Sequence, residues 1–424
     1  MSQKGVWTVA VVLLLIGLGA GYFVGQYTAP TKEVIVEVPV EVPVYPLSGE
    51  IPIGVVSPTD TGMKYYPRLI ELVEEEINDY IETLGHDFTV KFYLENAKAS
   101  PTTALEKIQS LNAMGIKVVL GMTYSSHIKT CYDYVQEQKI IIISDHSTAP
   151  ELAIPDDYVF RICPDDTLRG PILAKALEDL GIEAVVAIQR GDAWGDGMYE
   201  SFENSYEALG GVITELIRYA PDAKEFSAEV ALANDELLKA IDTYGKEKVA
   251  IQMFSFSDES LIILPQAAEY PTMLEVLWFD GERATRVVET GDMAITTKWI
   301  SPVDAPTASP KYVAFGEMFR EEFAEDPIPW YANFWDSAWI TTLSIIDAAS
   351  YDTEVLKEVI PRIASQYFGT SGWCNLNEAG DKFSDYDIQM IKEVEGVIKY
   401  VAVGRYTLAT GTVEWLVPIE ELKP

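Results

Sequence analysis

The sequence predicts an α/β protein with two lobes, each built on a doubly wound parallel sheet. From residue 51 onward, short apolar runs typical of strands alternate with segments of helical periodicity, and this alternation passes through two cycles. The chain has 424 residues, of which 48% are hydrophobic, enough for two separate cores. Because parallel strands are joined by crossover helices, the strand-helix order places helices on both faces of each sheet.

The individual elements follow from local patterns. In the first cycle Ser100 is the expected N-cap of a helix, and the expected strands are 51–56, 88–94, 116–120 and 140–143, with helices at 65–84, 101–113 and between the last two strands. In the second cycle the expected strands are 184–188, 212–217, 249–254 and 274–279, with helices at 167–180, 194–209, 225–244 and 258–269.

An uncharged, almost wholly apolar run covers residues 6–24. At about 1.5 Å per helical residue, about twenty residues cross a hydrocarbon core of about 30 Å, so residues 1–27 are expected to form one transmembrane helix that anchors the chain. Lys4 before this run weakly favours an amino end inside the cell. The alternative is a signal peptide cleaved near Leu18-Gly19-Ala20. Either way the body is expected at the extracytoplasmic face of the cell membrane, anchored there or secreted.

Residues 28–49 have the pattern of a stalk. Glu37-Val38-Pro39-Val40 is followed by a second copy of the same four residues, and proline disfavours both a helix and a central strand. A stalk spaces the body from the membrane, and a disordered linker is the alternative.

The charge and the cysteines limit the partners. The formal net charge is −35, from 66 acidic and 31 basic residues, so nucleic acid and anionic lipid surfaces are not expected as partners. A saline or acidic habitat is another reason for such acidity. The three cysteines, Cys131, Cys163 and Cys374, have no CxxC spacing. They allow one disulfide without selecting a pair.

The sequence lacks the common motifs of enzyme active sites. The sequence has no Gly-x-Ser-x-Gly elbow, no phosphate-binding loop ending in Gly-Lys and no His-Glu-x-x-His. The three histidines, His86, His127 and His146, do not form a helical ligand pair. We therefore expect a binding protein without an enzymatic activity, a metal or another cofactor.

Small polar residues follow three of the expected strands. Ser125 and Ser126 come after the third strand, Ser147 and Thr148 after the fourth, and Asp280 after the last strand of the second lobe. Ligands of such sheets sit beyond the carboxyl ends of strands, where helix amides lie. Hydroxyls with amides suit a carboxylate, and an acid on the facing lobe suits an ammonium, so the ligand predicted is an amino acid. Helix capping is the alternative role of each hydroxyl.

Several segments, in this order, resemble the branched-chain amino acid binding proteins that serve ABC importers. The resemblance covers nearly all of residues 51–387 and is carried by Val118-Val119-Leu120-Gly121, Ser125-Ser126, Ile142-Ile143-Ser144, Ala149-Pro150-Glu151-Leu152, Phe160-Arg161, Trp194-Gly195-Asp196-Gly197, Tyr270-Pro271-Thr272 and Trp278-Phe279-Asp280-Gly281.

This resemblance implies a periplasmic-binding-protein type I fold with a three-strand hinge. Lobe 1 would comprise residues 50–163 and 301–385, and lobe 2 residues 164–300 and 386–424. The implied ligand-binding residues are Ser125, Ser126, Ser147 and Thr148 for the carboxylate, Asp280 for the ammonium, and Tyr65, Trp194 and Phe254 for the side chain. Tyr124 stands where many members have a cysteine, and Asp258 or Glu282 are the alternatives to Asp280.

The expected function is capture of a small amino acid, branched-chain, aliphatic or a related amide, outside the cell and its delivery to the permease of an ABC importer. The alternative is the ligand-sensing ectodomain of a receptor with the same fold. A receptor needs a cytoplasmic signalling part, and only a few residues precede the apolar run, which favours the importer.

Overall fold

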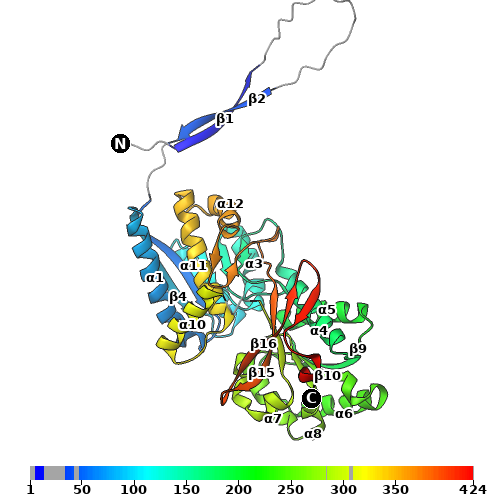
Figure 1. Ribbon diagram of the computed structural model, residues 1–424. Coiled ribbons are helices and arrows are strands. Elements are labelled where there is room, and N and C mark those ends of the chain that lie inside the picture. The colour runs from blue at the N-terminus through cyan, green and yellow to red at the C-terminus, as the bar shows by residue number, and fades with distance from the viewer. Residues whose placement is uncertain (1–4, 14–33, 43–46, 283, 305–308, 424) are drawn as a thin grey trace, which may run out of the picture.

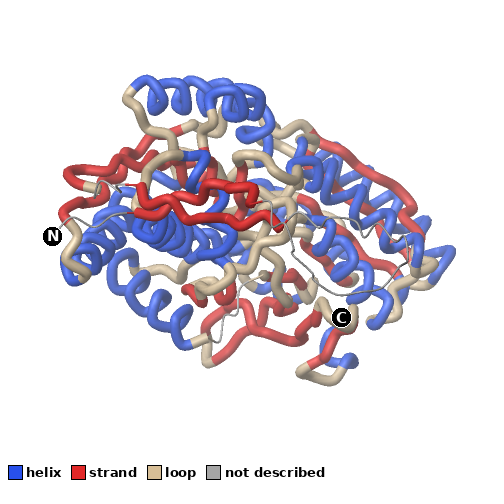
Figure 2. The backbone as a smooth tube through the Cα atoms, turned by 90° about the horizontal axis from the view of Figure 1, so that it is seen from above, coloured by secondary structure: helices blue, strands red, loops and turns tan. Residues whose placement is uncertain are grey.

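The computed structural model describes residues 5–13, 34–42, 47–282, 284–304 and 309–423. Two lobes lie one above the other in Figure 1, each with its own sheet and its own helices. Viewed from above, the sheets lie between helices (Figure 2). The predicted two-lobed α/β arrangement with parallel sheets is therefore confirmed.

Lobe 1 contains a five-stranded parallel sheet in the order β4-β3-β5-β6-β7. Its strands are β3 (Ser48–Ser57), β4 (Asp87–Asn96), β5 (Val118–Gly121), β6 (Ile141–Ser144) and β7 (Val159–Arg161). Its helices are α1 (Tyr66–Thr83), α2 (Pro101–Ala113), α3 (Ser125–Gln138), α10 (Pro310–Phe323), α11 (Pro329–Ala348) and α12 (Thr353–Ala364). One face of the sheet packs on α1, α10, α11 and α12, and the other on α2 and α3. The expected cap Ser100 accepts a hydrogen bond from the Thr103 amide.

Lobe 2 contains an eight-stranded sheet in the order β17-β16-β15-β12-β11-β10-β8-β9. Its strands are β8 (Ala184–Arg190), β9 (Val212–Tyr219), β10 (Val249–Phe254), β11 (Leu277–Asp280), β12 (Ile300–Val303), β15 (Tyr386–Val394), β16 (Val397–Thr407) and β17 (Thr412–Trp415). Its helices are α4 (Asp166–Asp179), α5 (Ala193–Ala208), α6 (Ser227–Tyr244), α7 (Ser257–Ala267), α8 (Pro271–Leu274) and α9 (Asp292–Thr296). Strands β8 to β12 pair in parallel, whereas β15, β16 and β17 extend the sheet with antiparallel pairs that the sequence did not predict.

The chain passes between the lobes after β7, after β12 and before β15. The predicted boundary at residue 301 falls inside β12, and the structure keeps the whole of β12 in the sheet of lobe 2. A two-stranded hairpin of β13 (Phe368–Gly369) and β14 (Gly372–Trp373) precedes the last crossing.

The amino-terminal predictions fall mainly outside the described residues. Residues 14–24 of the expected transmembrane helix are not described, and the part that is described forms a strand, β1 (Gly5–Leu13), instead of a helix. It pairs antiparallel with β2 (Val34–Val42) from the expected stalk, and Pro39 lies opposite Thr8. In the described part of the chain, no helix has the length and apolarity needed to span a membrane. The anchor therefore stays a prediction.

All three cysteines are buried and none of them forms a disulfide. Cys131 lies on α3, Cys163 at the first crossing and Cys374 just after β14. The disulfide that the sequence left open is thus not formed.

Candidate functional site

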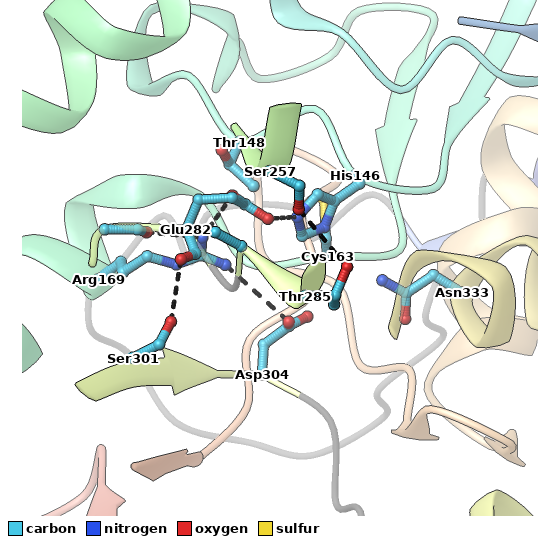
Figure 3. A network of polar contacts seen from close by, with 12 residues as sticks. His146, Thr148, Cys163, Arg169, Ser257, Glu282, Thr285, Ser301, Asp304 and Asn333 are labelled. Carbon is cyan, nitrogen blue, oxygen red and sulfur yellow. Dashed lines mark hydrogen bonds and ion pairs between the residues drawn. The ribbon is translucent and has the colours of Figure 1, made fainter. Parts of the chain in front are cut away.

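The lobes meet where the carboxyl ends of their parallel strands face each other. His146, which follows β6 in lobe 1, places Nε2 2.8 Å from Oε1 of Glu282, which follows β11 in lobe 2 (Figure 3). Nearby, Thr148 donates a 2.7 Å hydrogen bond to Asp166 at the start of α4. On α5, a Cβ added to Gly197 would lie 2.8 Å from a ring carbon of Pro150 in lobe 1, so a larger residue would separate the lobes. The lobes are therefore in close contact.

A buried charge network surrounds Glu282. Arg169 of α4 donates through Nη1 to Glu282 Oε2 at 3.0 Å and to the Gly281 carbonyl at 3.1 Å, and its Nη2 lies 3.9 Å from Asp304 (Figure 3). The Glu282 carbonyl accepts from the Ser301 hydroxyl. Burial raises the pKa of Glu282, but His146 and Arg169 together lower it to about 2. Glu282 is therefore an anion at any physiological pH.

His146 is 9% exposed and its ring lies 4.9 Å from that of Trp330 on α11. Burial lowers the pKa of His146, yet the charge and the hydrogen bond of Glu282, together with the charge of Asp304, outweigh burial, and the net shift is upward. Its other ring nitrogen, Nδ1, has no hydrogen-bond partner among the described residues. His146 and Trp330 line a small pocket together with Arg169, Glu282, Pro302, Val303, Asp304, Ile328 and Pro329. The pocket has room for about one water molecule, so the structure shows the cleft closed.

The predicted hydroxyl residues of lobe 1 gather at the amino end of α3. Ser125 accepts hydrogen bonds from the Ser147 hydroxyl at 3.0 Å and from the Ala149 amide at 3.2 Å. A hydroxyl has two acceptor positions and one proton, so Ser125 can still donate that proton. Ser126 is half-buried on the first turn of α3, and its carbonyl accepts from Thr130. Thr148 is buried and bonded to Asp166, as described above.

Arg161 fixes the loop that carries these hydroxyls. Its Nη1 donates to the carbonyls of Ser147 at 3.1 Å and Ala149 at 2.8 Å, and its other nitrogens pair with both carboxylate oxygens of Asp381. Both charged side chains are fully buried. Asp381 lies just before the last crossing, so one side chain connects the loop to the hinge.

Asp280 does not lie as the sequence predicted. Its two carboxylate oxygens accept from the amides of Glu282 and Ala284 and from the indole of Trp299, and it is fully buried. Burial raises its pKa well above the ordinary range. In the structure Asp280 therefore builds the turn after β11, while Glu282, an alternative from the sequence, contacts His146 of lobe 1.

The predicted aromatic residues divide into two groups. Phe254 is fully buried in the core of lobe 2 against Phe202, and this differs from the predicted place in the pocket. The ring of Tyr65 packs within lobe 1 on Phe319 of α10, and its hydroxyl donates to Glu325. Among the described residues, neither side chain forms a hydrogen bond or a ring contact with the other lobe.

Tyr124 of lobe 1 and Trp194 of lobe 2 both contact the ring of Phe256. Phe256, the residue before α7, stacks on Tyr124 of lobe 1 with ring centroids 5.2 Å apart and lies 4.7 Å from Trp194. The guanidinium of Arg190 lies 4.6 Å from the centre of the Phe256 ring. Sequence reasoning missed Phe256, Arg169 and Trp330. The signal for Phe256 was its place two residues beyond the end of β10.

Trp194→Ala is expected to weaken binding of a large apolar amino acid by about 2 kcal/mol, because the indole packs on other aromatic rings where the lobes close. Glycine and alanine should lose much less. Calorimetry with leucine and with alanine checks this difference. Equal losses for both ligands would assign Trp194 to the core alone.

Comparison with known proteins agrees with this architecture. An uncharacterized protein of Methanocaldococcus jannaschii is 28% identical in an alignment of length 396 that covers 86% of this chain and 91% of that protein. A leucine binding protein of Thermotoga maritima superposes with a TM-score of 0.68 at 19% identity, covering 84% of this chain and 98% of that one. An ABC transporter solute-binding protein of Rhodopseudomonas palustris, in complex with 3,4-dihydroxybenzoic acid, gives 0.70 at 15% identity, covering 84% and 97%.

The resemblance to branched-chain amino acid binding proteins of ABC importers is thereby confirmed, and the two solved structures establish the fold. The family model described as the receptor family ligand binding region matches residues 70–398. Since this match covers well over half of the 424 residues, the chain belongs to the receptor ligand-binding region family.

Proposed function

We propose that this chain captures a small amino acid, branched-chain or otherwise aliphatic, or a related amide, between its two lobes and delivers it to the permease of an ABC importer. The observation that carries the proposal is the buried anion Glu282, held in lobe 2 by Arg169 and facing lobe 1. A buried carboxylate favours a ligand with a cationic N–H donor, and the ammonium group of an amino acid is such a donor.

The opposite end of the ligand suits lobe 1. The first amides of α3 and the Ser125 proton are donors, and a carboxylate is a favourable partner for a helix amino terminus. The aromatic rings of Tyr124, Phe256 and Trp194 supply an apolar surface for a side chain. Burying a leucine-sized side chain contributes about 1.5–3 kcal/mol and each charged hydrogen bond about as much, so micromolar affinity is within reach.

We expect the full-length protein, purified in detergent, to gain thermal stability with leucine, isoleucine, valine or one of their amides. A ligand concentration of about 100 times Kd raises the free energy of unfolding of the protein by about 2.7 kcal/mol. Differential scanning fluorimetry against the common amino acids, their amides and benzoate checks this, with calorimetry for each positive ligand. If only benzoate stabilises the protein, the ligand class would be an aromatic acid instead of an amino acid. The Rhodopseudomonas protein is in complex with such an acid.

A second candidate is the ligand-sensing ectodomain of a receptor, favoured by the receptor family to which residues 70–398 belong. For either function we propose a place at the extracytoplasmic face of the membrane, anchored through the amino-terminal apolar run. Copurification of tagged full-length protein from native membranes separates the candidates, because an importer component brings a permease and its ATPase, and a receptor brings a signalling partner.

A further inference from the structure

We propose that His146 holds the place that the ligand ammonium takes opposite Glu282, so that an amino acid displaces His146 and binding releases its proton. The inference rests on the proposed amino-acid function and adds a competitor built into the chain. It follows from the contact between the lobes that His146 and Glu282 form (Figure 3).

Glu282 has one partner from each lobe. Its Oε2 is taken by Arg169, and both residues belong to lobe 2, so this ion pair persists when the lobes separate. Its Oε1 meets Nε2 of His146, which belongs to lobe 1 and moves away on opening. A protonated imidazole and an alkylammonium both present an N–H cation to a carboxylate. Since Oε1 lies 2.8 Å from the imidazole, the ligand and His146 compete for one oxygen.

Groups from every neighbouring element act on His146. Glu282 follows β11, Asp304 follows β12, Arg169 lies on α4, and Asp145 precedes His146 in the chain. Helix α11 contributes the uncharged Trp330, whose ring lies 4.9 Å away and whose face attracts a cation. Glu282 and Asp304 favour the protonated imidazole and Arg169 opposes it. The net effect is a pKa of His146 above its ordinary value of 6.5.

The direction of the pH dependence follows. In the closed, ligand-free protein the pKa of His146 is raised, and once His146 is displaced it returns to about 6.5. Between these two values binding releases up to one proton, so affinity rises with pH by up to tenfold per pH unit. Below about 6.5 the displaced imidazole keeps its proton, and above the raised value it has none to release. Glu282, with a pKa of about 2, does not titrate in this window.

The test is calorimetry of leucine binding to the full-length protein at several pH values, in two buffers with different ionisation enthalpies. The wild type should release up to one proton in the window above about pH 6.5. His146→Gln should release none, should bind leucine with a pH-independent affinity, and should bind more tightly than the wild type near pH 6. His146→Phe, which keeps a ring beside Trp330, should behave in the same way. His86→Gln, at an exposed histidine of lobe 1, is the matched control and should behave as the wild type.

Two outcomes overturn the proposal. Proton release that is unchanged in both His146 variants would assign the proton to another group, and weaker binding at every pH would make His146 a ligand contact instead of a competitor. If the wild type binds no amino acid at all, the proposed function fails. The pH-dependent contact between His146 and Glu282 can then still be tested without a ligand. Small-angle scattering of the ligand-free protein should then show a larger radius of gyration above the raised pKa, and His146→Gln should show that larger radius at every pH. Equal radii for wild type and variant below the raised pKa would refute the contact.

Discussion

Glu282→Gln is expected to weaken amino-acid binding by about 30-fold to several thousand-fold, because the ammonium would be buried opposite a dipole in place of a charge. Removing one partner of a buried charge pair costs about 2–5 kcal/mol. Glu282 is 4% exposed and is an anion at neutral pH, so the full effect should be seen there. Calorimetry with leucine and with its deaminated analogue checks this prediction, and the uncharged end of the analogue should make its affinity nearly insensitive to the change.

The two other acids near this turn are matched controls. Asp280→Asn should lower stability by about 1–3 kcal/mol with little change in affinity, since the Asp280 oxygens accept amides of the turn. Asp258→Asn should change neither quantity, because Asp258 is a largely exposed partner of Arg286. Loss of affinity in Asp280→Asn together with normal binding by Glu282→Gln would return the ammonium to the position that the sequence predicted.

Arg161→Met is expected to destabilise the protein by about 3–5 kcal/mol. The substitution leaves Asp381 buried without its partner and removes the donor to the carbonyls of Ser147 and Ala149. Urea denaturation followed by tryptophan fluorescence measures the loss. Arg362→Met is the surface control, since Arg362 and Asp347 are both well exposed, and it should cost less than about 1 kcal/mol.

A double variant separates charge from packing. Replacing both members, Arg161→Met with Asp381→Leu, removes the unpaired charge and should recover part of the stability. The double variant could instead have a lower free energy of unfolding than Arg161→Met, as expected for a second, independent core mutation. Arg161 would then stabilise the protein through its hydrogen bonds to the loop and not through its charge. A stable Arg161→Met protein would contradict the prediction altogether.

The sequence predicted the parallel part of the fold because buried parallel strands are continuous apolar runs. Strand β10 was expected at 249–254, where it lies, and β11 begins three residues later than expected, because Pro271 starts the short helix α8. The antiparallel β15 and β16 were missed, since residues 386–407 mix charged and apolar residues without a clear turn signal, although Gly396 reverses the chain there.

The site was predicted less well than the fold. The sequence located the strand ends, and Ser125, Ser147, Tyr124 and Trp194 do lie near the contact between the lobes. The sequence favoured Asp280 over Glu282 as the partner of the ammonium. The two acids are two residues apart, and only the structure shows which carboxylate accepts the backbone amides of the turn. Arg169 and Trp330 reach the pocket from helices that do not directly follow either strand in the sequence, and such contacts depend on how whole elements pack.

The three buried thiols also differ in reactivity between the folded and the unfolded chain. Burial raises the pKa of Cys131 and Cys374 to about 12, and that of Cys163 well above its ordinary value, so almost no thiolate exists in the native protein. Folding needs no oxidising partner, and the native state neither gains nor loses a bond when the redox poise of its surroundings changes. Only an opened chain presents these sulfurs to an oxidant or an alkylating reagent, which makes them internal reporters of unfolding in a molecule that carries no other cysteine.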